Sequence, residues 1–272
     1  MTKKQLLPVA VHSGSKSKAS RITARRTLPL AALCLSLAAQ VQAQDSGGWS
    51  WSVAPYLWGS SLKGATSTLP GAPPADVELS FSTLLDNLDF AGMVVANGRS
   101  GRWGITGDLQ YVKLNTQSGA LGPGGGNVQA KIQNTIATLL ADYLVSEGTD
   151  YQFWASGGLR YWRVKQDVTV TPGGPIPGGT NSWSNDWIDP VVGVRGRKNV
   201  GENGYLTGWA YLGGFGAGSE MMADVFAGYG YQFTPVTAGV LGYRWMSVDR
   251  KDGTYVYDMV QQGPLLGVAF RF

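Results

Sequence analysis

Histidine and cysteine, which often serve as general bases, nucleophiles and metal ligands, are nearly absent from this sequence of 272 residues. Its one histidine, His12, and its one cysteine, Cys34, both precede residue 44. The remaining 229 residues can therefore form no Ser-His-Asp or Cys-His nucleophile system, no zinc site with histidine or thiolate ligands and no disulfide. We expect no enzymatic activity, no bound metal and no cofactor.

Several other segments contain residues of the types found in catalytic, calcium-binding or phosphate-binding sites. Asp186 and Asp189 have the spacing nearest to a catalytic carboxylate pair, but residues three apart on a strand point to opposite faces. Residues 249–253, Asp-Arg-Lys-Asp-Gly, resemble a calcium loop, although two cations between two acids favour a solvated turn. The glycine-rich segments 122–126 and 213–218 have no P-loop lysine, which favours an outer loop and a bend at a strand end.

Residues 1–43 are organised like an export signal. Seven lysines and arginines, without an acidic residue, precede or flank the start of an apolar run at 28–39, and Val41-Gln42-Ala43 follows. This pattern predicts a signal peptide cleaved after Ala43, with residues 44–272 as the mature domain. Removing it leaves 15 of the 22 basic residues against 18 acidic ones, a formal net charge of −3. A chain without an excess of basic residues is not expected to bind nucleic acid.

From Trp49 onward polar and apolar residues alternate, interrupted by clusters of Gly, Pro, Asn, Asp and Ser. Alternation with a period of two predicts β-strands separated by turns. The exception is the segment 81–89, which predicts a short helix capped by Ser80 or Ser82. The ten predicted strands are residues 49–62, 90–100, 103–115, 127–146, 150–168, 183–198, 204–214, 219–232, 236–249 and 255–272.

The connections between these strands alternate in length. Those after the even-numbered strands are tight, and most of those after the odd-numbered strands are longer and richer in Gly and Pro, notably 63–89 and 171–182. This sorting predicts an all-β, closed antiparallel transmembrane β-barrel with both termini in the periplasm and the helix in the first outer loop. Ten strands are expected, with eight or twelve as alternatives. The residues of the eighth strand expected to face lipid are Val225, Ala227, Tyr229, Tyr231 and Phe233.

Charged residues on the opposite, lumen face are the best functional candidates, because they either line a solute path or pair and plug the interior. A barrel of ten strands is closer in size to barrels filled by side chains than to open porins, so we expect a plugged lumen. A hairpin centred on Thr234 would place Asp224 opposite Arg244, and Trp154, Trp162 and Trp209 would help to fill the interior. The predicted lumen charge network consists of Asp108, Arg160, Asp189, Arg195, Asp224, Arg244 and Arg271.

Three prolines, Pro55, Pro190 and Pro264, fall within predicted strands, although a closed barrel has no edge where a missing N–H is harmless. We expect them at bulges or strand ends. A soluble β-sandwich or a lipocalin-like barrel would tolerate them more easily and remains the alternative architecture.

The last ten residues, 263–272, form an amphipathic strand that ends on an aromatic residue. This resembles the terminal strand by which outer-membrane barrels are recognised for assembly, with Phe270 and Phe272 as the signal. The opening Trp51-Ser-Val-Ala-Pro-Tyr-Leu-Trp58 resembles the W-x-x-x-P-Y-x-W start of a largely uncharacterised family of proteobacterial outer-membrane barrel proteins. The similarity continues through 81–105, 213–220 and 241–249 to the C-terminus, and it implies fold and location but no activity.

Together these patterns predict a non-enzymatic integral protein of the outer membrane, with an envelope-structural or surface role. The expected partners are outer-membrane lipid and the barrel-assembly machinery, and the expected state is a monomer. One alternative is a narrow diffusion channel for small solutes, in which the arginines of the lumen would favour the passage of anions. A weaker alternative is a secreted, soluble β-barrel that binds a ligand.

Overall fold

The computed structural model describes residues 48–67, 74–121, 126–171 and 178–272, all within one compact unit, Gln40–Phe272. The predicted signal peptide, 1–43, lies outside the described residues, as do 122–125 of the first glycine-rich segment. The strands are β1 (Ser50–Trp58), β2 (Ser61–Thr66), β3 (Ala75–Leu79), β4 (Leu88–Ser100), β5 (Trp103–Leu121), β6 (Gly126–Glu147), β7 (Tyr151–Val170), β8 (Gly179–Val200), β9 (Gly204–Gly213), β10 (Met221–Thr234), β11 (Thr237–Asp252) and β12 (Tyr255–Arg271), and the helix α2 spans Phe81–Asp86.

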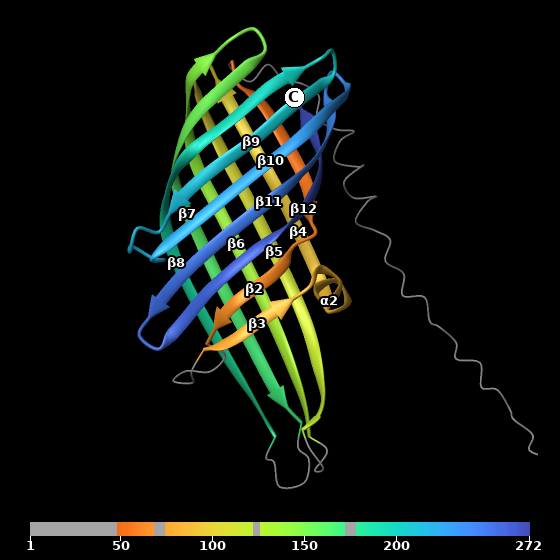
Figure 1. The fold of residues 1–272 in the computed structure, drawn as a ribbon, viewed down its shortest axis with the longest axis vertical. Coiled ribbons are helices and arrows are strands. Elements are labelled where there is room, and N and C mark those ends of the chain that lie inside the picture. Colours follow the sequence, from red (N-terminus) through yellow and green to blue (C-terminus); the bar gives the residue numbers. More distant parts are fainter. Residues whose placement is uncertain (1–47, 68–73, 122–125, 172–177) are drawn as a thin grey trace, which may run out of the picture. The chain divides into compact units, whose positions relative to one another are not determined.

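The sheet closes on itself as an antiparallel barrel (Figure 1). Consecutive strands from β4 to β12 pair with one another, and β1 pairs with both β4 and β12, which makes a ring of ten strands. β2 continues β1 along β12, and β3 adds a hairpin to β2. The predicted fold class is confirmed, but β3 was not predicted from the sequence.

The first loop contains the predicted short helix. Ser80 is its N-cap, and the Ser80 hydroxyl accepts a hydrogen bond from the Thr83 amide at 3.2 Å. This bond satisfies an amide that has no partner inside the helix. The helix ends at Asp86, three residues earlier than the sequence predicts, because Asn87 already has a non-helical backbone and Leu88 begins β4.

The three prolines lie inside β1, β8 and β12 rather than at the predicted bulges or strand ends, and at each one the pairing with one of the two neighbouring strands is interrupted. Pro55 falls in a gap of two residues in the pairing between β1 and β12. Pro190 lies immediately beyond the last pair between β8 and β9. Pro264 faces the break between β1 and β2, where the Gly59 amide donates to the Pro264 carbonyl at 2.8 Å. A proline therefore removes no N–H that the closed barrel requires at these positions.

The two ends of the barrel differ. Tight turns at 101–102, 148–150, 201–203 and 235–236 lie at the end that also holds the C-terminus (Figure 1). At the opposite end β6 and β8, with 22 residues each, extend well past β9, which has 10. A tilted strand crosses a bilayer with about 9–11 residues, so β5 to β8 are long enough to project beyond it.

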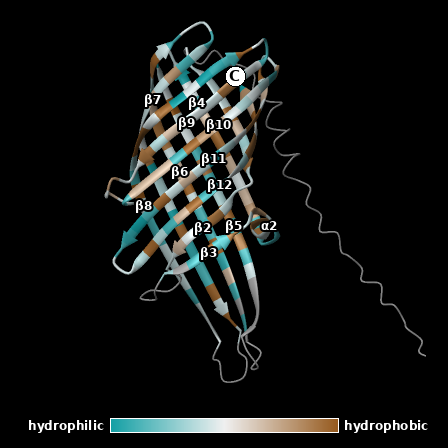
Figure 2. Ribbon diagram, viewed as in Figure 1, coloured by the Kyte–Doolittle hydropathy of each residue, from teal (hydrophilic) through white to brown (hydrophobic). Residues whose placement is uncertain are grey.

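The outer face of the barrel has an apolar band of the height that a bilayer requires. On β7 the outward residues from Tyr151 to Tyr161 are apolar, and the next one outward is Arg163. On β8 the band runs from Ile188 to Val194, with charged residues beyond it on both sides. Figure 2 shows the same alternation of hydrophobic and hydrophilic residues along the strands. The residues of β10 that were predicted to face lipid lie on the outer face of the barrel. They are exposed to varying degrees, and Phe233 is 63% exposed.

Aromatic side chains gather on the outside near the tight turns. Trp103 packs edge-on against Tyr143 with 4.9 Å between ring centroids, and Tyr231 lies 5.6 Å from Phe233. Such rings are typical of the boundary between the apolar layer and water. No helix within the described ranges has both the length and the apolar composition needed to span a membrane.

Candidate functional site

The centre of the lumen holds four of the seven predicted charges in one buried cluster, called here the central cluster: Asp108, Arg160, Asp224 and Arg244. Arg160 Nη2 lies 2.6 Å from Asp224 Oδ2, and Arg244 donates to the two Asp224 oxygens at 2.7 and 3.0 Å. Arg244 Nη2 also lies 3.0 Å from Asp108 Oδ2. Two arginines and two carboxylates give a cluster with no net charge. Charged side chains need such neutralisation because an unpaired charge is costly to bury.

Uncharged groups complete the hydrogen bonding of the central cluster. The Tyr56 hydroxyl donates to Asp108 at 2.7 Å and accepts from Arg244 at 3.0 Å. Trp209 Nε1 donates to Asp224 at 3.1 Å, and Arg160 Nε donates to Thr138 at 2.8 Å. These groups come from β1, β5, β6, β7, β9, β10 and β11, so the cluster cross-links walls that face each other.

The predicted ion pair between Asp224 and Arg244 is present, but the predicted register is wrong by two residues. Asp224 is directly opposite Met246, and Arg244 is opposite Phe226. The turn is at 235–236 rather than centred on Thr234, which shifts the whole ladder. The pair still forms because an arginine side chain reaches a diagonal neighbour on the same face.

Arg195 belongs to a second cluster, nearer the tight turns, whose acid is Asp142. Arg195 Nη1 lies 3.2 Å from Asp142 Oδ2, and the guanidinium carbon is 4.8 Å from the centre of the Trp154 ring. Thr106 and Ser156 each donate to Asp142 at 2.5 Å. Asp142 was not predicted, because the apolar residues around it occupy both faces of its strand and conceal which one is inward.

Asp189 and Arg271 also lie apart from the central cluster. Asp189 is fully buried and accepts from the Ser219 amide at 2.6 Å and from its hydroxyl at 2.8 Å. It therefore fastens the connection between β9 and β10 to the inner face of β8. Arg271 lies at the other end of the barrel, beside the tight turns. Asp186 is exposed, on the opposite face from Asp189 as predicted, so the two carboxylates do not form a catalytic pair.

Two of the three segments considered as ligand loops, 213–218 and 249–253, have structural roles. Residues 214–220 bend the chain out of β9, with positive φ at Gly214, Phe215 and Gly216. In the segment 249–253 the expected solvated turn is only partly correct. Asp249 pairs with Lys251 at 3.3 Å, but the Arg250 guanidinium lies 5.0 Å from the centre of the Trp187 ring, packed into the barrel.

Large side chains fill the lumen between the central cluster and the long-strand end. Trp162 is fully buried and stacks on Trp187 with 5.7 Å between centroids. Met222 and Met246, both exposed by 1% or less, contact Arg160 through sulfur. Trp162 and Trp154 thus fill the interior as predicted, and Trp209 stacks on Phe226 at 4.3 Å between centroids.

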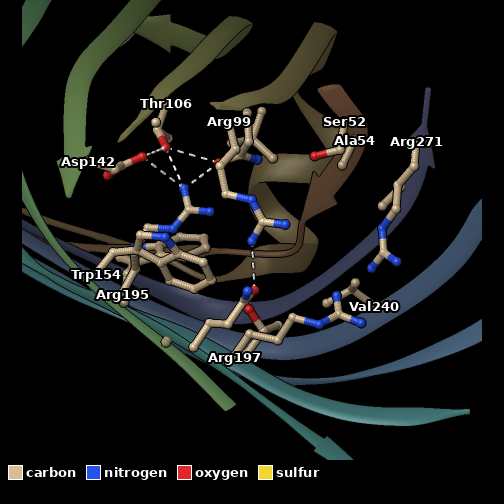
Figure 3. A pocket seen from close by; sticks show the side chains of 18 of the residues that line it. Ser52, Ala54, Arg99, Thr106, Asp142, Trp154, Arg195, Arg197, Val240 and Arg271 are labelled. Atoms are coloured by element: carbon tan, nitrogen blue, oxygen red, sulfur yellow. Dashed lines mark hydrogen bonds and ion pairs between the residues drawn. The ribbon is translucent and has the colours of Figure 1, made fainter. Parts of the chain in front are cut away.

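A cavity of about 700 Å³ occupies the tight-turn end of the lumen. Its lining reaches from Ser50 and Phe272, at the ends of the barrel chain, to Tyr56 and Asp108 of the central region. Figure 3 shows Arg99, Arg195, Arg197 and Arg271 around this cavity. Arg99 and Arg197 were not predicted as lumen residues, although both occupy inward positions on strands that the sequence identifies.

The described residues offer little for hydrolytic or metal chemistry. Across 48–67, 74–121, 126–171 and 178–272, no three His, Cys, Asp or Glu side chains gather closely enough to hold a metal ion. The buried carboxylates instead accept hydrogen bonds from arginines and hydroxyls. The arrangement can hold charge rigidly in place and can receive an anion at the arginine-lined end.

Comparisons with known proteins agree with this architecture. No family model matches the sequence, and no curated protein does. Among solved structures, the outer membrane protease OmpT from Escherichia coli has 10% sequence identity and a TM-score of 0.55, over 86% of this chain and 99% of OmpT. The translocator domain of the autotransporter NalP from Neisseria meningitidis has 11% identity and a TM-score of 0.37, over 89% and 95% of the two chains. The attachment invasion locus protein Ail from Yersinia pestis has 10% identity and a TM-score of 0.35, over 83% and 99%.

The closed antiparallel sheet and the similarity to OmpT show that the chain has the fold of outer-membrane β-barrel proteins. At 10% identity the similarity to OmpT concerns the fold alone and transfers no activity to this chain.

Proposed function

We propose that this protein is an integral, monomeric component of the outer membrane, with a structural or surface role in the cell envelope and no enzymatic activity. The central cluster is the observation on which the proposal depends. Its two arginines and two acids neutralise one another across the lumen, and Asp224, Arg160 and Arg244 are exposed by 1% or less. A lumen filled in this way supports the wall of the barrel and leaves no wide solute path.

The apolar band supports a position in the membrane and disfavours the soluble alternative. Side chains such as Leu159, Val192 and Leu241 are more than half exposed on the outer face. In water this band would be a large unpartnered apolar surface, whereas lipid would cover it. The expected lipid partners are those of the outer membrane.

The proposal includes export and assembly. Residues 1–43 would be removed as a signal peptide, and the terminal Phe270 and Phe272 would be recognised by the barrel-assembly machinery. The W-x-x-x-P-Y-x-W opening and the C-terminal segment suggest membership of the largely uncharacterised family of proteobacterial outer-membrane barrels that they resemble.

Fractionation of cells and heat-modifiable gel migration test location and fold together. We expect the mature protein in the outer-membrane fraction, migrating faster before boiling than after it. Recovery in the soluble periplasmic fraction would refute the proposal.

A narrow anion channel is the second candidate, favoured by the arginines around the cavity at the tight-turn end. Conductance in planar bilayers separates the two candidates, with a known porin as the positive control. A plugged barrel gives no current steps. Regular steps with anion selectivity would establish the channel instead.

A further inference from the structure

Three arginines of the cavity at the tight-turn end have no acidic partner among the residues that the structure describes. Arg99, Arg197 and Arg271 all line the cavity. None of the ion pairs formed within the described part of the chain involves them. Arg195, on the same cavity, differs because Asp142 neutralises it at 3.2 Å. The cavity therefore has an excess of positive charge, although the mature domain as a whole has an excess of acidic residues.

Two of the three arginines, Arg99 and Arg197, are held in place by uncharged groups. Arg99 Nη1 donates to Gln152 Oε1 at 2.8 Å. The Arg197 guanidinium lies flat on Tyr205, with its central carbon 3.4 Å from the ring centre. The Tyr205 ring in turn rests against Gly230, where any Cβ would overlap it. These contacts fix the positions of two charges without neutralising them, so this part of the site is preorganised for an anion.

The three arginines lie around the same cavity (Figure 3). Like charges in a concave region with low-dielectric walls raise the local potential and attract counter-ions. Arginine presents a planar fork of donors that matches the oxygens of carboxylate and phosphate groups. A bound polyanion would thus reduce the repulsion between the arginines. It would also accept hydrogen bonds from guanidinium groups that form no ion pair within the described part of the chain.

The remainder of the lining indicates the shape of the ligand. Ala54, Val240, Leu265 and Ala269 contribute apolar surface beside the arginines. The volume, about 700 Å³, lies within the range of sites for small organic molecules. Toward the membrane centre the cavity ends at Tyr56, Asp108, Trp209 and Phe226. A ligand would therefore enter and leave through the same end.

We propose that this arginine chamber, formed by Arg99, Arg197 and Arg271, is a blind binding site for a small organic polyanion. The ligand has carboxylate or phosphate groups on an apolar body, and it is held within the barrel without crossing it. The inference goes beyond the structural role proposed above, and it would stand or fall separately from the location of the protein.

Calorimetric titration of the folded mature barrel in detergent at low ionic strength tests the inference. The probe is benzene-1,3,5-tricarboxylate, a flat trianion, and benzamide is the neutral control. We expect saturable binding of one trianion per barrel and none of benzamide. The double variant Arg99→Gln/Arg271→Gln should bind at least about tenfold more weakly. Lys198→Gln is the matched control, because Lys198 neighbours Arg197 on β8 but points outward, and its affinity should equal that of the wild type.

A protection experiment needs no change to the arginines. Ser52 lines the chamber, and residues 44–272 contain no cysteine, so Ser52→Cys introduces a single thiol there. We expect the trianion, but not benzamide, to slow labelling of this thiol by a maleimide. Absence of saturable binding, equal affinity of the double variant and the wild type, or labelling that the trianion does not slow would overturn the proposal. If the double variant does not fold, the protection experiment decides.

Discussion

Removing the charge of Asp224 and of Arg244, singly and together, measures how strongly the central cluster plugs the barrel. Asp224→Asn and Arg244→Met keep approximately the original volumes, so the loss reflects charge rather than a new cavity. Asp224 receives donors from Arg160, Arg244 and Trp209, and it is completely buried. Its neutralisation leaves two buried arginines with too few acids, which costs about 3 to 5 kcal/mol. Arg244→Met leaves the opposite imbalance and should cost a similar amount.

The double variant restores neutrality, because one positive and one negative charge are gone. We expect it to lose no more than either single variant, which corresponds to a coupling energy of at least about 3 kcal/mol. The free energy of unfolding is measured by denaturant titration in lipid vesicles, followed by tryptophan fluorescence. The control cycle is Lys63 with Glu78, a pair 3.6 Å apart whose side chains are 73% and 77% exposed, where coupling should stay below about 1 kcal/mol. Additive losses at Asp224 and Arg244 would refute the pairing, and weak coupling would indicate a lumen filled with water.

Three further predictions concern the membrane, assembly and topology. Val192→Arg, in the middle of the apolar band on β8, should lower the free energy of unfolding in vesicles by about 2 to 4 kcal/mol, whereas Lys198→Arg beyond the band should leave it unchanged. Deleting Phe272 should reduce the heat-modifiable protein in the outer membrane without blocking export, because this exposed end residue adds little packing; an unaltered amount would contradict its role as an assembly signal. Protease added to intact cells should cut within 63–89 or 171–182, and cleavage at the tight turn 148–150 would invert the proposed topology.

The sequence by itself predicted ten barrel strands, with eight or twelve as alternatives, and it determined their approximate limits and their two faces. Alternation with a period of two is a local property, so it assigned Val225 and Tyr229 to the outside and Asp224 to the inside without knowledge of any neighbour. The connections at 63–89 and at 148–150 likewise revealed the two ends of the barrel through their lengths. Ser80 as the helix cap was equally local. For β3 there was no comparable signal, because it is only five residues long and depends on pairing with β2.

Which inward charges meet was decided by the tertiary structure. Asp108 and Arg244 are 136 residues apart, and they touch only because the closed barrel brings β5 and β11 to face each other across the lumen. Asp189, Arg195 and Arg271 share the same inward face, yet they lie at other heights along the axis. Periodicity reports the face of a residue but not its height, because height depends on strand tilt and on the stagger between strands, which are set when the barrel closes.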